Sequence, residues 1–341
     1  MPEPTIADWP VSAERRAKGL YWERAWNLVS GCTPVSRACD HCWAARESAM
    51  REHNPNPKIS DRHRGLTDHK SFAGDITTTP RFNGRIRINE DALQLPMRTR
   101  KPAVWSIWTD LFHPDVPFEF VVKAFCVMEY CRQHTFLVCT KRPERMLEFA
   151  HEVEIGMPYM DGKDDPTGRD GGWDSWPLQN VIPGTTIEDH RTSARCAYLV
   201  QVPAYRRFLS MEPLLGDVRL NLGIYSLGDG QWTGTRITGG NIHWITAGGE
   251  SGPNARALHP AWIRLVRDQA DAAGIPFHFK QWGEWLPWGQ FGNRVLECDH
   301  QKTVQDPYLG DFRTFRVGKK KAGRLLDGVL HDEFPAPVEA R

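Results

Sequence analysis

The stretch WNLVSGCTPVSRACDHCWAARESAMREH, residues 26–53, joins a strand-like run, a three-cysteine loop and a helix-like run. The apolar run Trp26–Val29 is short and is bounded by polar residues and glycine, which predicts a buried strand. Cys32, Cys39 and Cys42 follow within eleven residues, with the spacing C-x6-C-x2-C. A strand, a loop and a helix in this order form the repeating unit of parallel α/β sheets.

The same unit recurs along the chain. The clearest helix is predicted over His259–Ala273, where apolar residues recur every three or four positions before Gly274. Other helices are expected from Phe118, after Pro143 and after Asp189. Periodicity alone fits an open doubly wound sheet and a partial or complete (β/α) barrel equally well. The predicted strands are Trp26–Val29, Val104–Trp108, Thr135–Cys139, Val181–Thr185, Arg207–Met211, Trp244–Ala247 and Pro276–Phe279.

Charged residues stand directly after or at the end of six of these predicted strands. The carboxyl ends of parallel strands meet at one rim of a barrel, and functional groups gather there. We therefore expect a site built from these residues: Asp110, Lys141, Glu188, Glu212, Glu250 and Lys280.

The strand–helix alternation predicts a barrel over residues 22–289, after an N-terminal extension (1–21) and before a basic C-terminal extension (290–341). Insertions are expected at about residues 51–103, 156–180 and 223–241. Within the second, residues 161–176 are typical of a surface loop, and the third is typical of a hairpin.

Composition excludes several classes of protein. The 341 residues are 40% hydrophobic and 25% charged, with a net charge of +1, which is ordinary for a globular protein. No apolar run approaches the ~18 residues of a membrane helix, and the N-terminus does not resemble a signal peptide. We expect a cytoplasmic protein without a membrane partner. Disulfides are disfavoured there, so the five scattered cysteines are expected to be small buried hydrophobes.

The clustered cysteines predict a metal centre with soft ligands, either zinc or an iron–sulfur cluster. Structural zinc takes four ligands, and His41 is a poor fourth ligand because it is adjacent to Cys42, although a distant cysteine could serve. A cubane cluster can use three cysteines and leave one iron open.

Several motifs resemble a family of phage and bacterial proteins, known mainly as a phage-encoded domain of unassigned function with a three-cysteine motif. The resemblance spans roughly residues 22–335 and rests on WNLVSGCTPVSRACDHCWAA, IWTDLFHPDVP, HTFLVCTKRPERM, RFLSMEPLLG, ITAGGESGPNARALHP, FHFKQWGEW and RVGKKKAGRLLDG. The cysteine loop after the first strand also resembles radical S-adenosylmethionine (SAM) enzymes, whose usual spacing is C-x3-C-x2-C. Thr109-Asp110 and Thr140-Lys141 are similar to motifs of spore photoproduct lyase, a DNA repair enzyme.

The resemblance implies a barrel of the radical SAM type and a [4Fe–4S] cluster held by Cys32, Cys39 and Cys42. The open iron would bind SAM, whose reductive cleavage yields a 5′-deoxyadenosyl radical that abstracts a substrate hydrogen. An electron donor such as flavodoxin or ferredoxin is also implied. The candidate contacts are Lys141 for the SAM carboxylate, Asp110 and Ser106 for its ammonium group, Glu188 or Glu212 for the ribose, Glu250 for cofactor or substrate, and Cys139 as a hydrogen donor.

Two basic stretches suggest the substrate. Residues 313–324 hold six basic and no acidic residues, and residues 81–101 are rich in arginine. Such clusters attract phosphate backbones. Together with the lyase-like motifs, these basic stretches favour modification or repair of a nucleobase in DNA. A base in a duplex would have to be flipped out of the helix to reach the site. The alternatives are a zinc-stabilised nucleic-acid-binding protein without redox chemistry, and a radical SAM enzyme acting on a small molecule or a protein.

Overall fold

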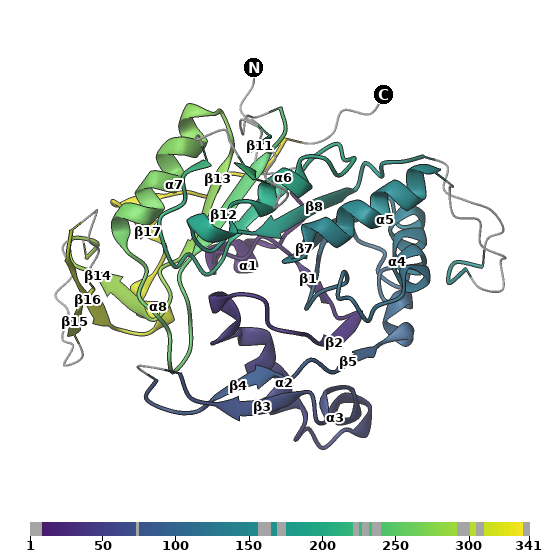
Figure 1. Ribbon diagram of the computed structural model, residues 1–341, viewed down its shortest axis with the longest axis horizontal. Coiled ribbons are helices and arrows are strands. Elements are labelled where there is room, and N and C mark those ends of the chain that lie inside the picture. The colour runs from purple at the N-terminus through teal and green to yellow at the C-terminus, as the bar shows by residue number, and fades with distance from the viewer. Residues whose placement is uncertain are drawn as a thin grey trace.

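A curled, wholly parallel sheet of seven strands forms the centre of the molecule (Figure 1). The computed structural model describes residues 9–72, 75–155, 165–168, 175–220, 225–226, 232–233, 240–291, 301–304 and 310–336. The strand order never reverses, which excludes a doubly wound sheet and corresponds to a partial (β/α) barrel. In order across the sheet, the strands are β1 (Arg24–Trp26), β6 (Val104–Ile107), β7 (Thr135–Thr140), β8 (Val181–Thr186), β9 (Phe208–Met211), β12 (Trp244–Gly248) and β13 (Phe277–Gln281).

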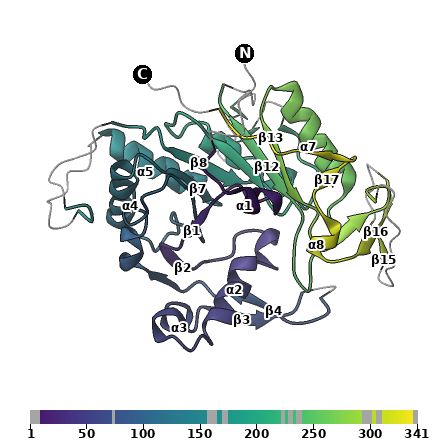
Figure 2. The same ribbon diagram turned by 180° about the vertical axis from the view of Figure 1, so that it is seen from behind.

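Helices between the strands cover the outer face of this half-barrel, as seen from both sides in Figures 1 and 2. The predicted helix at His259–Ala273 is confirmed, with His259 as its N-cap accepting a hydrogen bond from Ala261 N at 3.0 Å. The helix expected after Asp189 is reduced to a 3-10 turn, η4 (His190–Thr192), and one short helix. The helices are α4 (Phe118–Tyr130), α5 (Pro143–Ile155), α6 (Arg195–Leu199) and α7 (Pro260–Ala272).

The first predicted strand, Trp26–Val29, is wrong in extent, because two separate strands share this run. β1 ends at Trp26, and β2 (Val29–Gly31) pairs antiparallel with β5 (Ile86–Ile88), outside the barrel sheet. The side-chain amide of Asn89 holds the turn between them by donating to Asn27 O and Ser30 Oγ, each at 3.0 Å. An apolar run does not show where the chain leaves one sheet for another.

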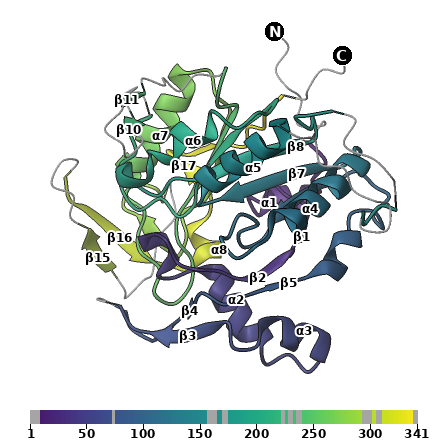
Figure 3. The same ribbon diagram turned by 45° about the vertical axis from the view of Figure 1, so that its right-hand side comes forward.

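The excursion expected at residues 51–103 carries its own secondary structure. With the cysteine loop it forms a separate layer, which lies below the barrel sheet in Figures 1 and 3. Its elements are η2 (Arg37–Cys39), α2 (Trp43–Arg51), α3 (Pro57–His63), the hairpin of β3 (Thr67–Lys70) and β4 (Thr79–Phe82), and η3 (Glu90–Gln94). We call this part of the chain the cysteine layer.

The segment after the barrel packs back onto it. Residues 331–334 run beside the edge strand β13, with an antiparallel bridge between His278 and Asp332. An edge strand covered in this way is protected from pairing with other chains. The elements here are β14 (Trp285–Pro287), β15 (Gln301–Val304) and β16 (Phe312–Arg316), which form one antiparallel sheet, then α8 (Lys319–Ala322) and the hairpin of β17 (Leu325–Leu326) and β18 (Val329–Leu330).

The remaining elements are small. In the predicted hairpin at 223–241, β10 (Tyr225–Ser226) pairs antiparallel with β11 (Trp232–Thr233), and α1 (Ala13–Ala17) precedes the barrel. Of the expected loop at 161–176, only residues 165–168 and 175–176 are among those described. None of the helices in the described ranges is both long and apolar enough to span a lipid bilayer.

Five of the barrel strands each contribute one apolar side chain to a cluster on the inner face of the sheet. Val104, Leu137, Ile182, Phe208 and Trp244 form this inner layer. Residues from both ends of the chain pack against it. These residues are Trp9, Tyr21 and Phe334. The ring centroids lie 5.4 Å apart for Trp9–Phe334 and 5.0 Å apart for Tyr21–Trp244.

We predict that Phe334→Ala lowers the free energy of unfolding by about 3 kcal/mol, because it leaves a cavity under Trp9 and Trp244. Urea unfolding measures the change. Leu330→Ala, on the exposed β18, is the control and should change stability by less than about 0.5 kcal/mol. Equal effects of the two substitutions would contradict the role given to Phe334.

Candidate functional site

A cavity of about 510 Å³ lies between the carboxyl ends of the barrel strands and the cysteine layer. It exists because the inward positions change from large apolar side chains to small and polar ones toward these ends, as at Ser106, Cys139, Thr186 and Ser210. Five of the six charged strand-end residues predicted from the sequence line it: Asp110, Lys141, Glu212, Glu250 and Lys280. The sixth, Glu188, contacts Lys141.

All three clustered cysteines line this cavity. Their thiols are close enough that charge on Cys42 raises the pKa of Cys32, and charge on Cys39 raises that of Cys42. Burial is the larger cause in both cases, and it brings the pKa of Cys32 to about 12. Within the described ranges no three His, Cys, Asp or Glu side chains stand together as a ready set of metal ligands.

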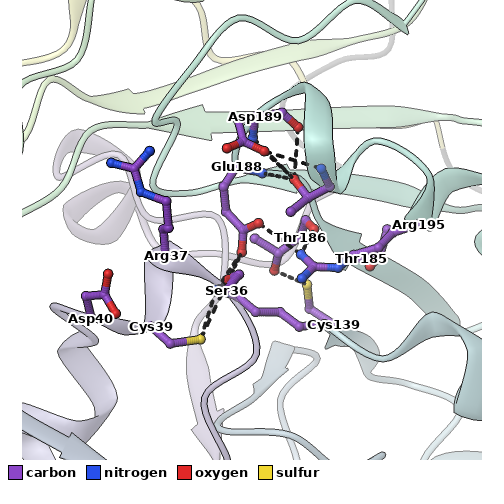
Figure 4. Close-up of polar contacts among 12 residues, drawn as sticks. Ser36, Arg37, Cys39, Asp40, Cys139, Thr185, Thr186, Glu188, Asp189 and Arg195 are labelled. Atoms are coloured by element: carbon purple, nitrogen blue, oxygen red, sulfur yellow. Dashed lines mark hydrogen bonds and ion pairs between the residues drawn. The ribbon is translucent and has the colours of Figure 1, made fainter.

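Lys141 connects the barrel rim to Cys39 (Figure 4 shows its partners). Its Nζ lies 2.7 Å from Glu188 Oε1, 3.4 Å from Ser36 Oγ and 3.7 Å from Cys39 Sγ. Ser36 Oγ also donates to Glu188 Oε1 at 2.7 Å, and Arg195 Nη1 donates to Glu188 Oε2 at 3.0 Å. Burial opposes ionisation of Cys39, but the charge of Lys141 and nearby hydrogen bonds outweigh it, so the pKa of this thiol is lowered. Cys39 is therefore easier to ionise than an ordinary thiol.

Arg142 connects the rim to Cys32. Its Nη1 lies 2.5 Å from Asp110 Oδ2 and 3.8 Å from Cys32 Sγ, and its Nη2 donates to Thr33 O at 2.7 Å. Thr140 Oγ1 donates to the other oxygen of Asp110 at 2.6 Å. Both oxygens of Asp110 are thus engaged by the protein, and Arg142 is a site residue that the sequence analysis did not single out.

Glu250 fastens the cysteine loop to the end of β12. It accepts hydrogen bonds from Arg256 at Nε (2.9 Å) and Nη2 (2.6 Å), and from the ring of His41 at 3.2 Å. Arg256 Nη1 in turn donates to Arg37 O, in the cysteine loop, at 2.9 Å. The preceding Gly249 allows close packing, because a Cβ there would lie 2.0 Å from a main-chain oxygen. Neither His41 nor Arg256 was predicted as a site residue, since their contact with Glu250 depends on the tertiary fold.

The cavity is also lined by a partly buried ion pair between Glu212 and Lys280. Glu212 lies 2.5 Å from Lys280 Nζ and accepts a hydrogen bond from Tyr21 OH at 2.7 Å. Burial raises the pKa of Glu212, but Lys280 outweighs it and the net shift is downward. Lys280 Nζ also stands 4.6 Å from the ring of Trp22. Tyr21 and Trp22 come from the segment before the barrel, which the strand pattern did not assign to the site.

Cys139, a candidate from the sequence, and Trp282, just after the end of β13, lie in different surroundings. Cys139 lines the cavity, and burial raises its pKa to about 12. Its Sγ lies 3.7 Å from Thr186 Oγ1. Trp282 is fully buried, and its indole N–H donates to Leu325 O at 2.9 Å, so this tryptophan packs in the core.

The basic stretch 313–324 is partly committed to the fold. Arg324 pairs with Asp332, and Arg316 donates to the main-chain oxygens of Gly252 and Pro253. Lys319 lines the cavity instead. Only part of this stretch therefore remains for binding an anionic partner.

We predict that Arg142→Met lowers the free energy of unfolding by about 3 kcal/mol, because Asp110 is left buried without its cation. Adding Asp110→Asn should restore part of the loss, and urea unfolding of the two single variants and the double variant measures this coupling. Arg219→Met, at the exposed pair with Asp217, is the control and should cost less than about 1 kcal/mol. Strictly additive effects at Arg142 and Asp110 would contradict the pairing.

The chain matches the model of a known protein family over most of its length. A family model described as "Protein of unknown function (DUF5131)" covers residues 17–335. No curated protein and no solved structure matches the chain.

Proposed function

We propose that this chain, which belongs to the DUF5131 family of proteins of unknown function, is a radical SAM enzyme that carries a [4Fe–4S] cluster and acts on a nucleobase in DNA. One observation carries the proposal. Three thiols of a single loop line the same cavity as the polar strand ends of a parallel half-barrel. This is the arrangement that the resemblance to radical SAM enzymes leads us to expect.

The residues present fit such a cluster. Three cysteine ligands leave one iron of a cubane open to a small ligand, and Cys32, Cys39 and Cys42 would supply them. Thiolates and sulfide bring negative charge, and cations stand beside two of the thiols: Lys141 at 3.7 Å from Cys39 Sγ and Arg142 at 3.8 Å from Cys32 Sγ. A structural zinc site would need a fourth ligand in addition to these three cysteines.

When bound, the cluster and SAM together would supply a one-electron reductive cleavage of a carbon–sulfur bond. Lys141 is the candidate partner for the SAM carboxylate. Its ammonium group would then interact with both that carboxylate and Glu188. Ser106 and Glu212 line the cavity where the ammonium and ribose groups could be received. Because its oxygens are engaged by Arg142 and Thr140, Asp110 acts in this proposal by holding Arg142 in place.

The lining of the cavity would also protect a reactive radical from water. Apolar side chains, among them Trp22, Phe82, Ile107 and Trp108, line it beside the polar groups and would limit access of water. Cys139 retains its proton because its pKa is raised, and a protonated thiol can donate a hydrogen atom to a product radical. An external donor, such as flavodoxin or ferredoxin, would deliver the electron.

The first test is chemical analysis of protein purified without oxygen. We expect about four iron and four acid-labile sulfide per chain, and 5′-deoxyadenosine when SAM is added to the dithionite-reduced protein. If the protein instead holds one zinc and no sulfide and does not cleave SAM, the proposal is refuted and the chain is a zinc-stabilised binding protein. If SAM is cleaved but DNA does not stimulate the cleavage, the substrate is instead a small molecule or a protein.

Two variants test the assigned residues. Cys39→Ala should lose the cluster, whereas Cys196→Ala, a buried cysteine outside the cavity, should keep it. Lys141→Ala should keep the cluster but weaken SAM binding by about tenfold, as measured by equilibrium dialysis, because it removes a charge-assisted hydrogen bond. Full iron content in Cys39→Ala, or unchanged SAM affinity in Lys141→Ala, would refute the corresponding assignment.

A further inference from the structure

An exposed tryptophan stands at the mouth of the cavity. Trp43, the first residue of α2, is 46% exposed although it directly follows Cys42 and lines the cavity. The ring of Trp108 contacts it edge-on, with centroids 4.7 Å apart and planes at 79°. Trp43 is therefore held in place by a second aromatic ring while much of its own surface remains in solvent.

Arg46 lies next to Trp43 on the same helix. Residues three apart in a helix share a face, and both side chains line the cavity. Arg46 Nη1 donates to Ser251 O at 3.2 Å, which fixes the guanidinium at the mouth. A Cβ on Gly252 would lie 1.5 Å from that nitrogen, so the glycine leaves room for it.

Charge is balanced inside the cavity and unbalanced at its mouth. The cations inside the cavity each have a carboxylate: Lys141 with Glu188, Arg142 with Asp110 and Lys280 with Glu212. Glu47, which also lines the cavity, pairs with Arg51 on the same helix. At the mouth, Arg46 and Lys319 form no ion pair with any carboxylate in the part of the chain that the structure describes. Burial lowers the pKa of Lys319, and the positive charges of Lys280 and Arg46 add to the effect although Glu212 and Glu284 oppose it. The mouth thus offers two cations to an anion from outside.

We infer that Trp43, Arg46 and Lys319 form a mouth site for single-stranded DNA, where a base stacks on Trp43 and Arg46 and Lys319 hold a phosphate. This inference rests on the proposed function, and it adds which form of DNA is bound and by which residues. Aromatic–base stacking beside cationic side chains is the common mode of single-strand binding. In a duplex the base faces are already stacked on one another, and a base must be unpaired before it can reach Trp43 or the cavity.

Fluorescence anisotropy with a labelled 20-nucleotide single strand and its duplex tests the mouth site on the purified full chain, without SAM or reductant. The single strand should bind more tightly than the duplex. Trp43→Ala should weaken single-strand binding by about tenfold. Trp43→Phe, which keeps an aromatic ring, should retain most of the wild-type affinity. Trp288→Ala is the matched control, because Trp288 is 63% exposed but does not line the cavity.

The two cations are tested through salt dependence. Arg46→Gln with Lys319→Gln should reduce the slope of log affinity against log salt by about 0.7 for each phosphate that is no longer neutralised. Lys320→Gln, at the neighbouring exposed position of α8 outside the cavity, is the matched charge control. Iron and sulfide content of every variant shows whether the neighbouring cysteine loop is intact.

The outcomes separate this inference from the proposed function. Equal binding by Trp43→Ala and Trp288→Ala, an unchanged salt slope, or preference for the duplex would overturn the mouth site, even if SAM is cleaved. Single-strand binding that depends on Trp43 in a protein that cleaves no SAM would keep the mouth site and reject the radical chemistry.

Discussion

The buried guanidinium of Arg142 is the interaction on which the rest of the site depends. It lies just after β7, pairs with Asp110 from the end of β6, and donates to Thr33 O in the cysteine loop. One side chain thereby joins two strand ends to the cysteine layer. A buried cation is tolerated only with a carboxylate partner and further hydrogen bonds, and Asp110 and the carbonyl oxygen supply them. The guanidinium also lies 3.8 Å from the sulfur of Cys32, so it contacts one of the three clustered thiols directly.

The cavity is the consequence of a barrel that does not close. At the amino ends of the strands, Trp9, Tyr21 and Phe334 fill the inner face. At the carboxyl ends, short polar side chains leave space, and the cysteine layer covers it. Four ion pairs stabilise that polar half, since each of these cations has a carboxylate within 2.7 Å. Polar groups at this density in a closed apolar core would carry a large desolvation cost.

Much of the fold could be predicted because its signals are local. The helix at His259–Ala273 followed from its apolar stripe, and five of the six charged residues at the strand ends line one cavity. The first strand could not be delimited, because the apolar run at Trp26–Val29 feeds two sheets and the branch point depends on Asn89, about 60 residues away in the chain. Tyr21 and Trp22 were missed as site residues for the same reason, since they reach the cavity only through the packing of the segment before β1.

The sequence by itself determined the parallel α/β class, the cysteine loop between strand and helix, and the edge of the sheet at which charged residues gather. These follow from periodicities and spacings within a few tens of residues. The tertiary structure decided which polar groups pair: Ser36 with Glu188, His41 with Glu250, and Tyr21 with Glu212. Such partners lie more than 150 positions apart, and their meeting depends on the curl of the sheet and on how the cysteine layer docks. No local pattern encodes that geometry, because it results from the packing of all seven strands at once.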